Sequence, residues 1–286
     1  YWAPPPAMGF AERTEAVKSV GWAEDIGLRE SMEDGFVFVD KFGGSPTSAF
    51  FAIYDGHDGR AAVDFVITQL HEQVYANLQR GMRAPEALTA AHESTDRNML
   101  SAGIQTSGAT SCCCLLREEG GQRLLYTAHL GDARAVLCRA GQAMRLTSAG
   151  DHKATDPEEA QRVVDAGGTI INERVNGMLA ISRAFGDHQL KRPVLPQDVV
   201  SHVPAISTVN ISQQDKFVIL ACDGLWDTME DQEAVNVVLQ CFRELRSPPH
   251  NMEDTRHISQ VLARMLVEEA LQRGSTDNVT CIFIFL

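Results

Sequence analysis

The sequence lacks a long apolar run, a basic excess and any paired cysteine spacing, and each absence excludes a class of protein. No stretch is long and apolar enough to cross a bilayer, and no signal peptide opens the chain. Basic residues number 25 against 38 acidic ones, for a formal net charge of −13, whereas a nucleic-acid binder needs basic side chains to neutralise phosphates. We therefore expect no transmembrane segment, no nucleic-acid partner and an intracellular protein of the cytoplasm, the nucleus or both.

The seven cysteines are an odd number and show no CxxC pair. This pattern argues against both a disulfide framework and a zinc site. Three of them, Cys112 to Cys114, are adjacent in an apolar run, where cysteine packs as a small apolar residue. We expect buried, reduced thiols rather than a redox motif.

The chain is long enough for one large core, because 44% of its 286 residues are hydrophobic. We expect one domain over residues 21–286 after an N-terminal extension over residues 1–20. The extension begins with three consecutive prolines, Pro4 to Pro6, which favour an extended backbone. No coiled-coil pattern is visible, so the expected state is a monomer.

Apolar periodicity predicts a mixture of strands and helices. They do not alternate strictly, so a parallel βαβ sheet is not expected. Residues 187–206 are rich in proline and form a long surface loop or a small subdomain. The predicted strands cover residues 36–39, 49–53, 111–116, 123–130, 133–138, 216–222 and 279–286. The predicted helices cover residues 61–78, 84–100 and 157–166, the last capped by Asp156, together with one that starts at Thr228 as N-cap and one around residues 258–266.

Carboxylates recur at the ends of the predicted strands. Two apolar runs each end in an Asp-Gly pair, at Asp55 and at Asp223, and a glycine there lets the backbone approach a cation closely. Ligands that are all oxygen select Mg²⁺ or Mn²⁺ over zinc, and two such ions would activate water and clamp a phosphoryl displacement. Each pair alone is equally typical of an ordinary turn. The further acidic residues near strand ends or turns are Glu33, Asp34, Asp132, Asp227 and Asp277.

An ordered set of motifs, running from about residue 27 to the C-terminus, resembles the metal-dependent type 2C Ser/Thr protein phosphatases, the PPM family. The resemblance implies an α+β fold in four layers, α-β-β-α, with two antiparallel sheets flanked by helix pairs. It makes residues 21–286 the catalytic domain and residues 187–206 the family's variable flap. The motifs are Arg29-Glu-Ser-Met32-Glu33-Asp34, Tyr54-Asp55-Gly56-His57, Thr106-Ser-Gly-Ala-Thr110, Leu130-Gly-Asp132-Ala-Arg134, Asp151-His-Lys153, Gly167-Gly168, Arg174-Val-Asn-Gly177, Ser182-Arg-Ala-Phe-Gly-Asp187, Ala221-Cys-Asp223-Gly-Leu-Trp-Asp227 and Ser275-Thr-Asp277-Asn278.

The resemblance also assigns metal ligands. Asp55 would bridge two ions, the Gly56 carbonyl and Glu33 would serve one of them, and Asp223 and Asp277 would hold the other. Asp34 would be an outer partner that binds metal-bound water. The pair Asp132 and Asp227, with Asp223, resembles a weaker third site, although both could be turn or cap residues.

Two further roles follow from the resemblance. Arg29 would bind the substrate phosphate, and His57 would protonate the leaving Ser or Thr alkoxide while a metal-bridging hydroxide attacks phosphorus directly. The alternatives are a surface charge for Arg29 and a turn histidine for His57. Asp58 stands where the family usually has a small residue, and we expect its charge to raise the His57 pKa unless it is a solvated turn residue.

The implied function is Mg²⁺- or Mn²⁺-dependent hydrolysis of phosphoserine and phosphothreonine in phosphorylated proteins. A catalytically silent pseudophosphatase that acts as a scaffold is the alternative, and it is disfavoured because such proteins typically replace metal carboxylates. A phosphatase of small phosphorylated metabolites would share the same site. The residues on which this distinction depends, all acidic here, are Glu33, Asp55, Asp223 and Asp277.

Overall fold

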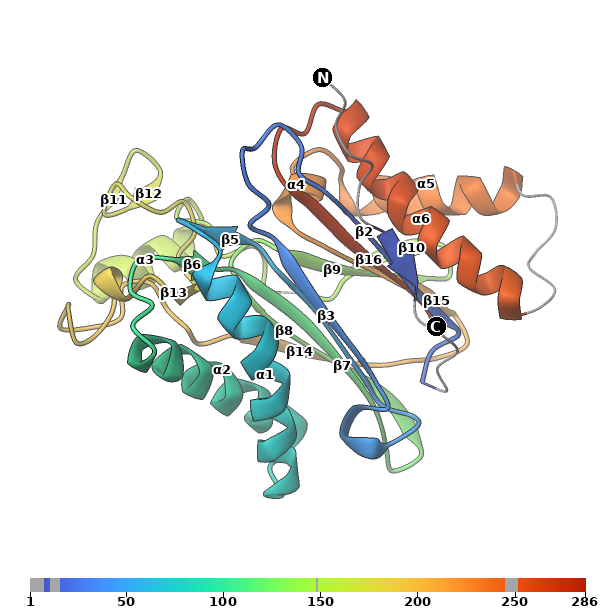
Figure 1. Ribbon diagram of the computed structural model, residues 1–286, viewed down its shortest axis with the longest axis horizontal. Helices are drawn as coiled ribbons and strands as arrows, with labels where there is room; N and C mark the ends of the chain where they lie inside the picture. Colours follow the sequence, from blue (N-terminus) through green and yellow to red (C-terminus); the bar gives the residue numbers. More distant parts are fainter. Residues whose placement is uncertain (1–7, 11–15, 148, 245–251) are drawn as a thin grey trace.

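Two antiparallel β-sheets lie face to face in the computed structural model, and helices cover their outer surfaces (Figure 1). The structure describes residues 8–10, 16–147, 149–244 and 252–286. Residues 1–7 and 11–15 of the predicted extension lie outside the described chain, while Met8–Phe10 forms strand β1 and pairs with β2 (Ser19–Asp25). The limit of the extension at residue 20 stays a prediction, but the four-layer α-β-β-α architecture is confirmed.

Both sheets are built from antiparallel pairs throughout, as the absence of βαβ alternation predicts. The six-stranded sheet has the order β1-β2-β16-β15-β9-β10, and the five-stranded sheet has the order β14-β8-β7-β4-β3. The remaining strands of the first are β16 (Val279–Phe285), β15 (Asp215–Ala221), β9 (Arg134–Arg139) and β10 (Gln142–Arg145). Those of the second are β14 (Ala205–Asn210), β8 (Gln122–Leu130), β7 (Ser111–Glu119), β4 (Ala49–Tyr54) and β3 (Gly35–Asp40).

Strand β4 shows why the central strands read as unbroken apolar runs. Phe51 and Ile53 face the core between the two sheets, whereas Phe50 and Ala52 face the helices outside. Both faces of the strand are therefore buried, and all six of its residues are inaccessible. The five-stranded sheet is covered by α1 (Ala61–Gln79) and α2 (Ala84–Ser101), and the six-stranded sheet by α5 (Asp231–Glu244) and α6 (Met252–Gln272) (Figure 1). No helix in the described part of the chain is long and apolar enough to cross a membrane.

The starts of two helices test the predicted caps. Asp156 caps α3 (Pro157–Asp165) by accepting hydrogen bonds from two backbone N–H groups of the first turn, as predicted. The prediction that Thr228 caps the next helix is wrong. The chain first forms the single turn α4 (Asp223–Trp226), and α5 begins at Asp231. The Thr228 hydroxyl instead donates to the Leu225 carbonyl at 2.9 Å and so closes the earlier turn.

Residues 187–206 form a packed unit rather than a free surface loop. Leu190, Val199 and Val200 are buried together with Val163 of α3, in a cluster separate from the main core. Short elements complete the fold: the strands β5 (Gly56–His57), β6 (Gly108–Ala109), β11 (Ile170–Ile171), β12 (Arg174–Val175) and β13 (Phe185–Gly186), and the 3₁₀ turns η1 (Phe42–Gly44) and η2 (His188–Leu190).

Gly21 in β2 packs directly against the backbone of α6. A Cβ atom on Gly21 would lie 2.2 Å from the backbone carbon of Ser259, and backbone cannot move aside as a side chain can. We expect Gly21→Ala to lower the free energy of unfolding by about 1–3 kcal/mol in urea denaturation. Gly120→Asn is the control, because its Cβ meets nothing within 4 Å and Asn tolerates the positive φ. Equal denaturation midpoints for Gly21→Ala and the parent would contradict this packing.

Candidate active site

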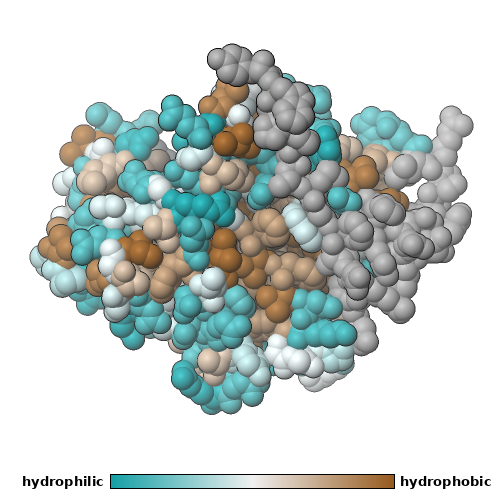
Figure 2. Space-filling model, in the orientation of Figure 1, coloured by the Kyte–Doolittle hydropathy of each residue, from teal (hydrophilic) through white to brown (hydrophobic). Residues whose placement is uncertain are grey.

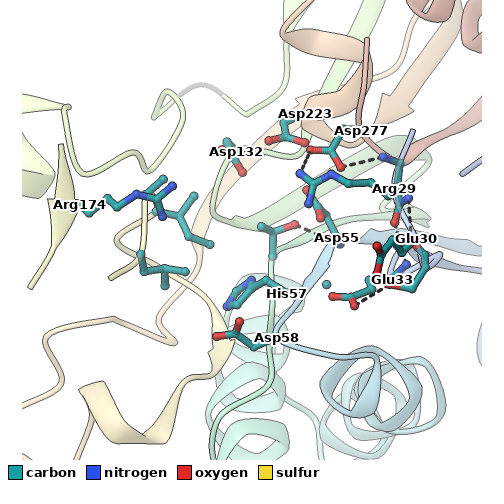
Figure 3. A pocket seen from close by; sticks show the side chains of 17 residues that line it. Arg29, Glu30, Glu33, Asp55, His57, Asp58, Asp132, Arg174, Asp223 and Asp277 are labelled. Carbon is teal, nitrogen blue, oxygen red and sulfur yellow. Dashed lines mark hydrogen bonds and ion pairs between the residues drawn. The ribbon is translucent and has the colours of Figure 1, made fainter. Parts of the chain in front are cut away.

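Strand ends from both sheets surround a cavity of about 520 Å³ (Figure 3). Asp55 follows β4 and Asp132 follows β8, both in the five-stranded sheet, whereas Asp223 follows β15 and Asp277 precedes β16 in the other sheet. The sandwich thus brings carboxylates from distant parts of the sequence to one edge. The predicted site residues that line this cavity are Arg29, Glu33, Asp55, Gly56, His57, Asp132, Asp223 and Asp277.

Three carboxylates meet at the floor of the cavity. One oxygen each from Asp55, Asp132 and Asp223 lies within 4.8 Å of the other two. Burial, with added repulsion from Asp223, raises the pKa of Asp55 well above its ordinary value and that of Asp132 to about 7. Burial also raises the pKa of Asp223. This cluster is electrostatically unfavourable by itself and is relieved by protons or by cations.

Asp34 lies beneath the floor, and its side chain does not line the cavity. The residue is 1% exposed, and burial raises its pKa to about 7 although Thr280 donates a hydrogen bond of 2.6 Å to Oδ2. Its Oδ1 atom is buried without a hydrogen-bond partner among the described residues. A buried acceptor without a donor suits a group that receives a hydrogen bond from bound water, as the resemblance implies for Asp34.

The Glu33 carboxylate is held at the rim by its neighbours. Ser31 donates its hydroxyl to Oε1 at 2.9 Å, and the Gly59 backbone donates to Oε2 at 3.2 Å. Gly56 packs directly on this segment, because a Cβ there would lie 2.6 Å from the Glu33 carbonyl oxygen. The missing side chain of Gly56 thus lets the turn after Asp55 contact Glu33. Asn278 also holds Glu33 in place, because its side-chain oxygen accepts the Glu33 N–H at 2.7 Å.

Arg29 and Asp277 form a pair at the mouth of the cavity. The Arg29 Nη2 atom donates to Asp277 Oδ2 at 2.6 Å, while the Arg29 side chain remains 59% exposed (Figure 3). The planar guanidinium carries five N–H donors, so further donors are available for an anion in the cavity. This placement fits phosphate binding better than an isolated surface charge.

His57 stands on the wall of the cavity, and its main partner was missed by the sequence analysis. Burial lowers the His57 pKa, but Asp187, whose Oδ2 lies 2.8 Å from Nε2, raises it, and Asp58 adds a smaller contribution in the same direction. The net shift is upward. Asp58 thus raises the His57 pKa, as predicted, but Asp187 raises it more. Asp187 ends the motif that starts at Ser182, to which the sequence analysis assigned no role.

Comparison with known proteins agrees with this geometry. The model of the family described as protein phosphatase 2C matches residues 20–279. The chain belongs to this family. It is 36% identical over 286 residues to protein phosphatase 2C homolog 1 of Saccharomyces cerevisiae, covering 93% of both chains, and 38% identical over 269 residues to the homolog 1 of Schizosaccharomyces pombe, covering 90% of this chain and 70% of that one. The solved serine-threonine phosphatase 2C of Toxoplasma gondii shares the fold, with a TM-score of 0.77 at 23% identity over 99% of both chains.

The carboxylate set of this protein phosphatase fits divalent metal ions. The floor offers oxygen donors from three Asp residues and no His or Cys within the cluster that the described residues form. Hard cations prefer such donors. Cations would neutralise the carboxylates whose pKa values burial raises, and their bound water would donate a hydrogen bond to the unpartnered Asp34 oxygen.

Asp227 is displaced from the cluster. Its side chain is 61% exposed, and the Lys153 ammonium lies 3.2 Å from its Oδ1 and 3.6 Å from Oδ2 of Asp132. A positive charge of the phosphatase itself therefore occupies the region that the resemblance assigns to a third ion. Any cation bound between these two carboxylates competes with Lys153, which is consistent with a weak site.

One wall of the cavity comes from a segment to which the sequence analysis gave no role. Arg174 of β12 and residues 179–181 line the cavity, and Figure 3 shows the Arg174 side chain across from Asp132. In the described chain no lining residue comes from 187–206, whose role as a flap stays a prediction. The sequence signal for this wall was the Arg174-Val-Asn-Gly177 motif, to which no function was attached.

Proposed function

We propose that this phosphatase hydrolyses phosphoserine and phosphothreonine in proteins with the help of two Mg²⁺ or Mn²⁺ ions. The observation that carries the proposal is the convergence of Asp55, Asp132 and Asp223 within 4.8 Å at the floor of a cavity whose walls hold Arg29 and His57. Ions bound there would lower the pKa of water and neutralise charge on the phosphoryl oxygens. Mg²⁺ and Mn²⁺ fit the oxygen-only donors.

The ligands divide between the two sheets. As the family resemblance implies, Asp55 would serve both ions, with Glu33 and the Gly56 carbonyl on one ion and Asp223 and Asp277 on the other. Asp34 would accept a hydrogen bond from the water that the ions hold. All of these carboxylates are present, so nothing supports a silent scaffold protein.

The chain's own residues would then bind and protonate the substrate. Arg29 donates hydrogen bonds to the phosphoryl oxygens, and His57 gives a proton to the leaving Ser or Thr oxygen, which is a poor leaving group without one. Water attacks phosphorus directly. A thiol nucleophile is not favoured, since burial and Asp34 raise the pKa of Cys222 beside the floor well above its ordinary value.

Phosphate release from a phosphothreonine peptide tests this function. The protein should turn over in Mn²⁺ and lose all activity in EDTA and in the Asp223→Asn variant. Sugar phosphates and nucleotides, assayed beside the peptide, should be poorer substrates. No turnover of the peptide by a folded, Mn²⁺-supplied protein would contradict the proposal, and preference for the small phosphates would favour the metabolite alternative.

We also propose an intracellular, monomeric protein. All seven cysteines are free, and six of them are buried, as expected for a chain that folds without disulfides. Sedimentation analysis of the purified chain tests the monomer, and a stable dimer at micromolar concentration would contradict it.

Arg29→Lys separates hydrogen bonding from charge at the phosphate site. Lysine keeps the positive charge but cannot donate two parallel hydrogen bonds, so kcat/KM for the phosphopeptide should fall about 10- to 100-fold, or about 1.4–2.8 kcal/mol. The control is Arg192→Lys, whose side chain is 68% exposed and pairs with Asp198. Steady-state kinetics measure both. Equal kcat/KM values for Arg29→Lys and the parent would show that Arg29 is a surface charge.

A further inference from the structure

The partner of His57 comes from a distant part of the chain. His57 Nε2 lies 2.8 Å from Asp187 Oδ2, although 130 positions separate the two residues. The Asp187 side chain is 2% exposed, while that of His57 is 23% exposed and lines the cavity (Figure 3). The Nε2 edge of the ring thus meets a buried carboxylate, and the ring also lines the cavity where substrate would bind.

A small sheet brings this pair together. Strand β6 lies between β5 and β13, and its residue Gly108 is opposite both His57 and Gly186, the neighbour of Asp187. A Cβ atom on Gly108 would lie 2.2 Å from Asp187 Oδ2 and 2.3 Å from His57 Nε2. The histidine and the carboxylate therefore meet directly over a residue that has no side chain, and any other residue at position 108 would separate them.

Asp187 adopts a backbone conformation that must be enforced. Its φ of 50° lies in the left-handed region, which residues other than glycine adopt rarely, Asp and Asn more readily than most. The preceding N–H, of Gly186, donates to the buried Asp96 carboxylate at 2.9 Å, and the Lys191 ammonium donates to the same carboxylate at 2.8 Å. A buried ion pair thus fixes the backbone that aims Asp187 at His57.

We propose that Asp187 is a positioning residue for catalysis, acting through His57. Its carboxylate accepts the hydrogen bond from Nε2, which fixes the orientation of the ring. Nδ1 is then the nitrogen that is free to donate a proton to a substrate in the cavity. The role rests on the proposed phosphatase function, in which His57 protonates the leaving group. As the ester P–O bond breaks, its electron pair goes to the leaving oxygen, and that oxygen takes the proton from Nδ1. Water forms the new P–O bond and loses a proton, which restores the imidazolium.

The leaving group provides a test that a purely structural role would not pass. A Ser or Thr oxygen needs a proton as it departs, whereas p-nitrophenolate does not. Asp187→Asn should therefore lower kcat on a phosphothreonine peptide about 10²-fold or more, with KM little changed, and lower kcat on p-nitrophenyl phosphate only a few-fold. Asparagine fills the same space but lacks the negative charge of the carboxylate, so it no longer holds the doubly protonated ring firmly through Nε2–H. Asp165→Asn, an exposed position on α3, is the charge-matched control and should leave both rates unchanged.

Two more variants make the test decisive. Gly108→Ala keeps both side chains, but its methyl group would lie 2.2 Å from Asp187 Oδ2 and 2.3 Å from His57 Nε2 and so force them apart, which should reproduce the selective loss on the peptide. In the His57→Gln background, adding Asp187→Asn should cost nothing further, because the two residues act as one unit. Mn²⁺ affinity should match the parent in each variant, and thermal denaturation checks that each remains folded at the assay temperature.

The possible outcomes separate the two claims. An equal loss on both substrates, or no loss on either, would overturn the positioning role while leaving the phosphatase function intact. Additive losses from His57→Gln and Asp187→Asn would overturn it as well. A parent protein that releases phosphate from neither substrate in Mn²⁺ would overturn the proposed function and, with it, the role of Asp187.

Discussion

Asp55→Asn is expected to abolish phosphatase activity and at the same time to stabilise the metal-free protein. Asp55 is one of three carboxylates that approach within 4.8 Å of one another, and its loss would remove the group that we propose both ions share. Activity should fall by at least about 10³-fold. Without ions the same carboxylate repels Asp223 and Asp132, and a neutral amide of equal size should raise the free energy of unfolding by on the order of 1 kcal/mol.

Steady-state kinetics in Mn²⁺ and thermal denaturation in EDTA measure the two effects of Asp55→Asn. Asp64→Asn is the control, because Asp64 is an exposed residue of α1 that pairs only with Arg60 among its described salt-bridge partners. Its activity should be unchanged. Retained activity in Asp55→Asn would contradict the ligand role, and a lower melting temperature in EDTA would contradict the electrostatic account of the cluster.

The stabilisation by Mn²⁺ should grow as the pH rises from about 5 to 8. Burial raises the pKa of Asp34 and of Asp132 to about 7, against an ordinary value of 3.8. The folded protein therefore holds protons that the unfolded chain has already lost, so these groups lower the free energy of unfolding as the pH rises through this window, by up to a few kcal/mol in total. Bound cations would replace these protons, so the loss of stability with rising pH would disappear in Mn²⁺.

The difference in melting temperature between Mn²⁺ and EDTA samples isolates this effect. Buried histidines act in the opposite direction: burial lowers the pKa of His92 to about 4 and of His152 to about 3, so the destabilisation that they cause at low pH disappears as the pH rises to the ordinary histidine pKa. They contribute equally to both samples and cancel in the difference. A rise in melting temperature on Mn²⁺ addition that is the same at pH 5 and pH 8, with no proton release on Mn²⁺ binding, would contradict the raised pKa values.

The carboxylates at the strand ends could be predicted from sequence because their signal is local. Asp55 and Asp223 each follow an apolar run that ends in Asp-Gly, and a run buried on both faces, such as β4, is visible without any knowledge of its neighbours. The roles of the ligands and the four-layer arrangement came from the resemblance rather than from these patterns. Both the family and the fold are confirmed.

The parts that could not be predicted depend on contacts between distant segments. Asp187 reaches His57 only because β13, β6 and β5 pair in one small sheet, and no local sequence pattern marks Asp187 as a partner of His57. Lys153 is similar, because its position between Asp132 and Asp227 is set by tertiary packing. Strand β2 was not predicted because its apolar residues are interrupted by Gly21, whose missing side chain admits α6.

The most direct test of the account counts bound ions and released phosphate in the same samples. Metal-stripped protein is titrated with Mn²⁺, bound ions are measured by electron paramagnetic resonance, and hydrolysis of a phosphothreonine peptide is followed at each point. We expect activity to appear as the second ion binds and to saturate near two ions per chain, with Asp223→Asn binding fewer ions and staying inactive. Hydrolysis without bound Mn²⁺, or two bound ions without hydrolysis, would contradict the central claim that this carboxylate cluster makes the chain a phosphatase.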